Sequence, residues 1–493
     1  MNRRDFSRSL GLLAFGSGWT LPSSAATASV ATVRVDRRVK YQTIEGFGFF
    51  GARDSWWGEP KDLVDPAWAR LVIDDLGLTM WRNEYYPPGD VGREADADWL
   101  KQRPVMEVLR DRAAASGVPL KTILSVWSPP ASMKCASDGD SIHEGKPNPG
   151  GTKDGGAVCP SQRQRFAEWL IDGLQLYALS GVKVYALSFQ NEPLFRQSYN
   201  SGRYPRAAYA DTLAAIGPAI HARFPGVKLF GPESLLETEA GKNGTEFDPY
   251  WYTAHVLRHA QAMRQLGAFA VHAYTPSMLP TAASKAARFW TNFHAAVAPS
   301  GLPTWMTETS GYVDAWEGGK NAKGEDRPGA FDLAQALFAA LYYGKVSAWL
   351  WWQGSESDGM SESSLMQGTV VGKRYYASKH FYRFIRPGAR MLRSSSDDPR
   401  LLAVAFAHEQ LGNFVSVLIN GAHIEKRVKL VADGLPEQLD AFVTSASTRI
   451  GVEPTRVARD AIVLPPRSIM TVVSGSYLEA VSSPPPSAPL RTK

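Results

Sequence analysis

Two glutamates follow short apolar runs, at points where a barrel enzyme would place its chemistry. The stretch YALSFQNEP (residues 185–193) begins as an apolar run and stops at Asn191-Glu192-Pro193, because proline does not continue a central strand. The stretch TWMTETSG (304–311) ends its own apolar run at Glu308. Two carboxylates about 5–5.5 Å apart are what retaining glycoside hydrolysis requires, one as proton donor and the other as nucleophile. Taken alone, Glu192 could equally be a carboxylate in an ordinary turn.

The elements expected around these glutamates decide between the two interpretations. Short apolar runs alternate with longer helical patterns, which is typical of a parallel (β/α)₈ TIM barrel. We expect strands at 44–50, 78–83, 121–126, 184–190, 227–231, 269–273, 304–307 and 347–352. We expect helices at 66–76, 105–115, 162–180, 205–223, 250–265, 282–296, 331–343 and 375–385. Glu192 then ends the fourth strand and Glu308 the seventh, so the two carboxylates face each other across the barrel mouth.

Polar and aromatic residues at the other strand ends complete a candidate sugar site. Arg82 would keep one carboxylate charged and Tyr274 would orient it. Asn191 is suited to bind a sugar 2-hydroxyl. Trp127 and Trp352 would form the floor of a sugar subsite. The further strand-end residues are His272 and Glu233. His272 could contact the substrate or, equally well, only form hydrogen bonds at the barrel mouth. Glu233 could belong to the site or, equally well, only lie near the start of a helix.

The pattern changes at Pro387, where short strands separated by turns indicate a β-sandwich. An alternating run near residue 30 has no place in the barrel, so we assign it to the same sandwich. The expected organisation is therefore a signal segment (1–28), an N-terminal sandwich strand (29–43), the barrel (44–386), the β-sandwich (387–475) and a disordered tail (476–493).

The N-terminus and the two cysteines predict an exported protein. Arg3-Arg4 precede a short apolar stretch and small residues, as in a twin-arginine signal; a frayed basic terminus is the alternative. The site of action would be periplasmic or extracellular. In that setting Cys135 and Cys159 are better explained as a disulfide than as two free thiols. The formal charge of +6 comes without a dense basic run, so nucleic acid is not expected as a partner. No stretch approaches 18 consecutive apolar residues, so stable membrane insertion is not expected either. The oligomeric state stays open.

The chain also resembles glycoside hydrolase family 30, within the clan of retaining barrel enzymes. The matching stretches are QTIEGFGFFGA (42–52), SVWSPPASMK (125–134), SFQNEP (188–193), VHAYTP (271–276), WMTETSG (305–311) and WLWWQ (349–353). This resemblance implies Glu192 as the general acid/base and Glu308 as the nucleophile. It also implies that Arg82, Trp127, Asn191, His272, Tyr274 and Trp352 contact the sugar, with no metal or organic cofactor.

Two departures from the family narrow the substrate. The stretch FFGARDSWW (49–57) differs from the form in glucosylceramidase-like members, which argues against ceramide glycosides. The stretch GSESDGMSESS (354–364) lacks the arginine-tyrosine cluster with which glucuronoxylan-reading members bind uronic acids. The leading hypothesis is a secreted retaining β-glycoside hydrolase that cuts within a polysaccharide such as xylan or a β-1,6-linked glucan or galactan. The alternatives are an exo-acting β-glycosidase or β-xylosidase on short saccharides, and a non-catalytic carbohydrate-binding relative.

Overall fold

The computed structural model describes residues 30–51, 64–85, 93–241, 247–274, 280–356, 361–450, 453–475 and 477. The predicted signal segment (1–28) and almost all of the predicted disordered tail (476–493) lie outside these residues. Within them, no helix combines the length and the hydropathy that a membrane span needs.

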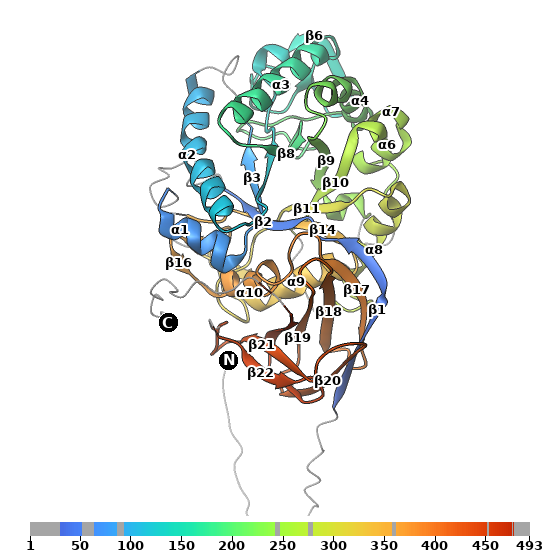
Figure 1. Ribbon diagram of the computed structural model, residues 1–493. Helices are drawn as coiled ribbons and strands as arrows, with labels where there is room; N and C mark the ends of the chain where they lie inside the picture. Colours follow the sequence, from blue (N-terminus) through green and yellow to red (C-terminus); the bar gives the residue numbers. More distant parts are fainter. Residues whose placement is uncertain are drawn as a thin grey trace, which may run out of the picture.

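Eight parallel strands close into a barrel, which confirms the predicted TIM barrel (Figure 1). Around the barrel the order is β2, β3, β4, β8, β9, β10, β11 and β14, so neighbours in space are also neighbours in the β/α sequence. Their bounds are Gly46–Phe50, Met80–Glu84, Lys121–Ser125, Val184–Ser188, Lys228–Leu235, Leu266–His272, Thr304–Glu308 and Val346–Trp352. Because every pair is parallel, all carboxyl ends meet at one mouth of the barrel.

One glycine shows why the strand sequences are constrained near this mouth. A Cβ added to Gly48 in β2 would lie 1.6 Å from the carbonyl oxygen of Met80 in β3. Only glycine therefore allows the two strands to approach this closely, and their ends carry Phe50 and Arg82.

Helices surround the barrel (Figure 1). They are α1 (Pro66–Arg70), which continues as a π-helical turn (Leu71–Leu76), α2 (Arg93–Ala115), α3 (Arg163–Leu179), α4 (Arg206–Arg223), α5 (Leu236–Glu239), α6 (Tyr252–Arg258), α7 (Ala260–Gln265), α8 (Lys285–Val297), α9 (Ala330–Tyr342) and α10 (Lys373–Tyr382). The single helix predicted at 250–265 is wrong. The chain breaks at His259, whose ring nitrogen caps α7 by accepting from the backbone N–H of Ala262.

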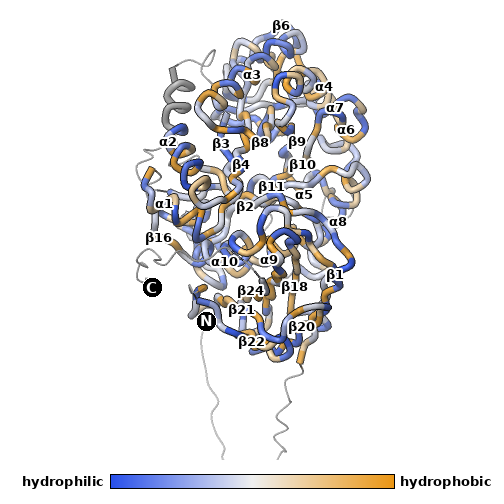
Figure 2. Tube along the Cα trace, in the orientation of Figure 1, coloured by the Kyte–Doolittle hydropathy of each residue, from blue (hydrophilic) through white to orange (hydrophobic). Residues whose placement is uncertain are grey.

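The barrel interior is a packed core of mixed large and small side chains. Trp305 fills its centre and stacks near Tyr185, with the ring centroids 6.2 Å apart. Alanines from neighbouring strands make room for it: Ala186, Ala268, Ala270 and Ala348. Figure 2 shows hydrophobic residues along central strands such as β8 and β18. Because the interior is filled, the chemistry is confined to the mouth.

Below the barrel lies a nine-stranded sheet, with α9 and α10 between them (Figure 1). It contains β1 (Ala31–Thr43), β17 (Arg390–Ser396), β18 (Leu401–His408), β19 (Asn413–Asn420), β20 (Lys426–Ala432), β21 (Gln438–Thr444), β22 (Thr455–Ala458), β23 (Ile462–Leu464) and β24 (Ser468–Ser474). Residues from both ends of the sheet, such as Val428 and Leu439, share one apolar cluster, so the sheet folds over on itself. The N-terminal strand β1 pairs with β17 and β20, as the fold prediction expected.

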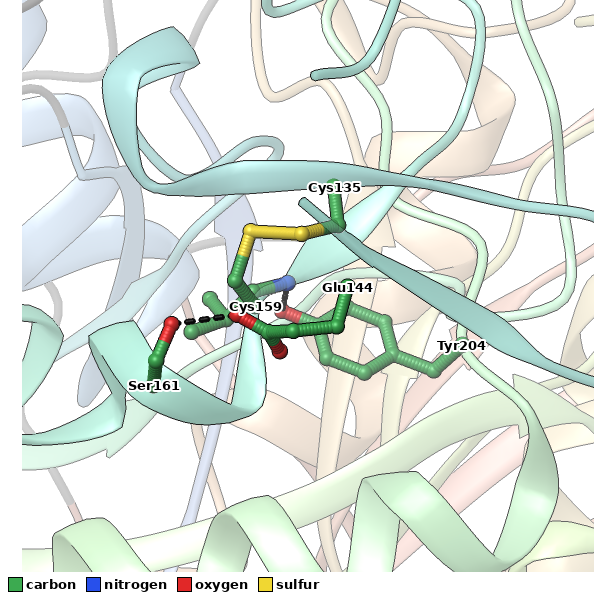
Figure 3. The surroundings of a disulfide bond; sticks show 6 residues. Cys135, Glu144, Cys159, Ser161 and Tyr204 are labelled. Carbon is green, nitrogen blue, oxygen red and sulfur yellow. Dashed lines mark hydrogen bonds between the residues drawn. A yellow bond between two sulfur atoms is a disulfide. The ribbon is translucent and has the colours of Figure 1, made fainter. Parts of the chain in front are cut away.

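The insertion after β4 is an ordered segment with strands of its own. It forms a three-stranded sheet of β5 (Lys134–Ser137), β6 (Ile142–Pro147) and β7 (Ala157–Val158). Cys135 and Cys159 form the predicted disulfide here, beside the Ser161–Glu144 hydrogen bond and the ring of Tyr204 (Figure 3). Two small hairpins, β12–β13 (Gly319–Lys320, Asp326–Arg327) and β15–β16 (Met366–Gln367, Val370–Val371), decorate later loops.

Candidate active site

The mouth of the barrel collects every predicted site residue. Arg82 lies in β3, Glu308 ends β11, His272 ends β10 and Trp352 ends β14. The others lie in the first residues of the loops beyond strand ends: Trp127 after β4, Asn191 and Glu192 after β8, and Tyr274 after β10. These residues lie together because the carboxyl ends of parallel barrel strands are all at the same mouth.

The two predicted catalytic carboxylates meet around one histidine. Glu192, His272 and Glu308 each place a side-chain oxygen or nitrogen within 4.8 Å of the others. His272 Nδ1 lies 3.0 Å from Glu192 Oε1 and 3.7 Å from Glu308 Oε1. The hydroxyl of Tyr274 donates to Glu308 Oε1. This separation of the carboxylates is short enough for a nucleophile and an acid to act on one glycosidic bond.

The fully buried guanidinium of Arg82, in β3, reaches side chains of β4, β9 and β11 and of the loop after β8. Its Nη1 donates to Glu308 Oε2 at 2.7 Å, and its Nη2 donates to Asn191 Oδ1 at 2.7 Å and to Glu233 Oε1 at 3.0 Å. Its Nε donates to Ser125 Oγ at 3.1 Å. The planar fork of arginine suits this task, since one side chain holds partners in several fixed directions.

The carboxylate of Glu233 lies inside the site, not at an exposed helix start. It is fully buried in β9, and its Oε1 accepts from Arg82 and lies 3.5 Å from His272 Nε2. Burial opposes its ionisation, but Arg82 and His272 outweigh that effect and lower the pKa of Glu233 to about 2. Of the two interpretations of Glu233 that the sequence leaves open, the structure supports a place within the site and not one near a helix start.

The surroundings of His272 and Glu192 shift their proton affinities upward. Burial disfavours the charged imidazole, but the nearby carboxylates of Glu308, Glu192 and Glu233 raise the pKa of His272 to about 9. Burial is also the largest influence on Glu192 and raises the pKa of its carboxyl group, against the pull of His272. A carboxyl group with a raised pKa can carry the proton that a general acid donates. The spacing of this cluster could accommodate a metal ion, but both nitrogens of His272 face carboxylates, as in an imidazolium ion pair.

Three aromatic rings line the mouth beside Arg82. Phe50 stacks on Trp352, with the centroids 4.4 Å apart, and lies 5.2 Å from the ring of Trp127. The Arg82 guanidinium carbon lies 5.3 Å from the ring centroid of Phe50 and 5.0 Å from that of Trp127. Trp127 is almost fully buried, so it supports the cluster, whereas Trp352 is partly exposed.

Sequence reasoning missed several neighbours of the site. Phe50 ends β2 and would have been found by extending the strand-end search to aromatic residues. Gln190 is buried and donates to the carbonyl oxygens of Trp127 and Asn191, both at 2.8 Å. Tyr199 lies in the loop after Glu192, where no periodic pattern marks it. Burial first, and then the charges of Glu192 and Glu308, raise the pKa of its hydroxyl to about 12.

A barrel with paired glutamates after its fourth and at the end of its seventh strand, and with a β-sandwich attached, defines the glycoside hydrolase class. The comparisons with known proteins agree, although no family model matches the sequence. The chain is 21% identical over 455 residues to the glucuronoxylanase XynC of Bacillus subtilis, covering 90% of this chain and 89% of that protein.

Solved structures share the whole architecture. A glycoside hydrolase family 30 subfamily 8 xylanase from Clostridium acetobutylicum superposes with a TM-score of 0.68 at 20% identity, covering 90% of this chain and all (100%) of that chain. An endo-β1,6-glucanase superposes with a TM-score of 0.66 at 17% identity, covering 92% and 96%. The resemblance to glycoside hydrolase family 30 and the prediction of a glycoside hydrolase are thereby confirmed.

Proposed function

We propose that the protein is a retaining, endo-acting β-glycan hydrolase whose substrate carries no uronic acid. The observation that supports the reaction is the pair Glu192 and Glu308, close together but in different surroundings. Glu308 accepts hydrogen bonds from Arg82 and from the hydroxyl of Tyr274, which hold its carboxylate in one orientation. Glu192 has a raised pKa and can hold a proton. Endo action is favoured because the similar proteins include endoxylanases and an endo-β1,6-glucanase.

The reaction would proceed in two displacements. An oxygen of Glu308 attacks the anomeric carbon while the bond to the leaving sugar oxygen breaks, and that oxygen takes the proton of Glu192. Glu192, now anionic, removes a proton from water, which attacks the anomeric carbon and breaks the bond to Glu308. Asn191 uses its Oδ1 to bind Arg82, so its amide N–H groups are directed to other partners and suit a sugar 2-hydroxyl.

The loop after β14 supports a neutral substrate. Its described part carries the carboxylates Glu356 and Glu362, close to the segment where family members that bind uronic acids carry cations. The buried guanidinium of Arg374 is engaged with the carbonyl oxygens of Tyr312 and Ser361. Within the described part of this loop (354–356 and 361–364), no arginine or lysine is present to pair with a glucuronate. We therefore place xylan without uronic acid side groups and β-1,6-linked glucan or galactan ahead of glucuronoxylan.

A panel of glycans with a nucleophile variant tests the proposal. The wild type is incubated with linear neutral xylan, glucuronoxylan, β-1,6-glucan and β-1,6-galactan, and the products are separated by chromatography. We expect a ladder of oligomers from one neutral glycan and at least 10³-fold loss in Glu308→Ala, since the covalent step is removed. Glu409→Gln changes an exposed carboxylate of the sandwich and is the matched control. Release of single sugars alone would favour the exo-acting alternative, and binding without cleavage would favour a non-catalytic relative.

Stereochemistry provides the second test. Early products followed by NMR should have the β configuration of the substrate, as a double displacement requires. With azide added, Glu192→Ala should give a β-glycosyl azide, because azide replaces water in attacking the sugar bound to Glu308. Early products of inverted configuration would refute the two-step mechanism.

We also propose that the protein is exported through its N-terminal twin-arginine segment. The disulfide between Cys135 and Cys159 supports an oxidising destination. Replacing Arg3 and Arg4 by lysine should retain the protein in the cytoplasm, as followed by cell fractionation. Unchanged export of this variant would contradict the proposal.

A further inference from the structure

Glu233 occupies a central position among the charges of the site. It lies in β9, between β8, which leads to Glu192, and β10, which carries His272. Its side chain is fully buried, so it cannot touch a substrate. Its backbone adopts φ +56°, in the left-handed region that side chains other than glycine rarely occupy. A strained, buried carboxylate at the mouth calls for a role that ordinary core packing does not supply.

Both cations of the site contact this carboxylate. Arg82 Nη2 and His272 Nε2 approach the same Oε1 of Glu233, at 3.0 Å and 3.5 Å. Each cation turns its other nitrogen to one of the reacting carboxylates: Arg82 Nη1 to Glu308 at 2.7 Å, and His272 Nδ1 to Glu192 at 3.0 Å. The five side chains form one chain in which acidic and basic groups alternate, with Glu233 in the middle.

We propose that Glu233 is a positioning residue for glycoside cleavage, because its carboxylate holds Arg82 and His272 in place against Glu308 and Glu192. This inference rests on the proposed function. Without Glu233, the Nε2 of His272 would lose the carboxylate that faces it. Arg82 would keep its bonds to Glu308, Asn191 and Ser125 but lose the one partner that it shares with His272. The cations could then shift with the substrate, and a displacement of about 1 Å can reduce a rate by about 10²-fold.

Glu233 also keeps the buried site electrically balanced during the reaction. Before attack, with Glu192 protonated, the anions Glu308 and Glu233 balance the cations Arg82 and His272. After attack, Glu308 is esterified and neutral, and Glu192 is anionic, so Glu192 and Glu233 balance the same cations. The negative charge moves from Glu308 to Glu192, and Glu233 is the one carboxylate of the three whose charge does not change. A buried site that stays neutral through the step avoids the cost of an unpaired charge.

The variant Glu233→Gln tests the proposal, because it keeps the shape and removes the charge. We expect kcat to fall by about 10²-fold with KM changed less than about fivefold, since Glu233 does not touch the substrate. The pKa of His272, followed by NMR of isotope-labelled histidine, should fall by roughly one unit or more. The signal of His272 among the nine histidines is assigned by its loss in His272→Gln. The other groups facing His272, namely Glu192, Glu308, Arg82 and Tyr274, are unchanged in Glu233→Gln.

Two further variants make the result decisive. Glu239→Gln alters another buried carboxylate six residues along the chain, which accepts from the backbone N–H of Thr253 at 3.1 Å. It should keep the wild-type kcat and the wild-type pKa of His272. Glu233→Asp keeps the charge but shortens the reach, so it should restore part of the His272 pKa and little of kcat.

Each outcome separates this inference from the proposed function. A folded Glu233→Gln with wild-type kcat and an unchanged His272 pKa overturns the positioning role. Loss of the fold in both Glu233 variants, seen by calorimetry, also overturns it, because Glu233 would then act on stability alone. A wild type that cleaves no β-glycan refutes the proposed function, while the His272 pKa still reports on the geometry around Glu233.

Discussion

The raised pKa of His272 predicts how the stability of the protein depends on pH. The imidazole has a pKa of about 9 in the folded protein and an ordinary value of 6.5. The folded state therefore holds the proton more tightly than the unfolded state. The resulting stabilisation is fully present below pH 6.5 and is lost as the pH rises through 9. Since one pKa unit corresponds to about 1.4 kcal/mol, the full contribution is about 3 kcal/mol.

The substitution His272→Gln isolates this contribution, because glutamine keeps hydrogen-bonding groups and has no charge to lose. Other groups titrate in the same window. Burial lowers the pKa of Lys134 from 10.5 to about 7, so its unfolded form binds more protons and stability rises with pH there. The difference in unfolding free energy between wild type and His272→Gln removes such common effects. We expect this difference to decrease by about 3 kcal/mol in total, mostly between pH 7 and pH 10.

The assay is urea unfolding followed by tryptophan fluorescence, repeated from pH 6 to pH 10. His380→Gln is a matched control, since His380 is also buried and its ring nitrogens bond Thr471 and Thr444 at 2.8 and 2.9 Å. Burial and then Lys379 lower the pKa of His380 to about 3, so it is neutral in both states above pH 7. Its difference from wild type should be flat in that range. A flat or rising difference for His272→Gln would refute the imidazolium assignment.

Three further outcomes follow from the geometry. Removal of both Cys135 and Cys159 by serine should lower the unfolding free energy by about 3 kcal/mol in urea titrations, because the disulfide spans a sequence separation of 24. Arg82→Lys should reduce kcat by about 10²–10³-fold in steady-state assays with little change in KM, since one ammonium cannot reproduce the fork that reaches both Glu308 and Glu233. Trp352→Ala should raise KM several-fold, measured on the preferred glycan, because the stacked surface on Phe50 is lost.

The barrel could be predicted because its signals are local. Strands buried on both faces read as apolar runs, and the observed bounds differ from the expected ones by only a few residues at most ends. The fifth strand is the exception. The sequence predicts its end at Gly231, but the strand continues to Leu235. The prediction stops too early because Glu233 and Ser234 are polar and yet fully buried. Local hydrophobicity cannot show that a buried glutamate is paired with an arginine 151 residues away.

The insertion after β4 is difficult to predict because one of its strands is exposed rather than buried. Its strand β6 (Ile142–Pro147) is mostly exposed, so it lacks the apolar alternation by which half-buried strands are recognised. Its order comes from pairing with β5 and from the disulfide, which act between segments. The break at His259 is another non-local effect, because the sequence pattern alone continues through it.

The roles of Glu192 and Glu308 could be paired from the sequence, but what makes them different is visible only in the structure. Glu192 has φ +43° and Glu233 has φ +56°, each at a cost of about 1–2 kcal/mol for a side chain other than glycine. Such strain persists only where surrounding contacts hold it, and here the contacts are ionic. Arg82 lies on the side of Glu308 and His272 on the side of Glu192, with Glu233 between the cations. The left-handed backbone at Glu192 therefore persists because ion pairs such as that with His272 hold its side chain in place.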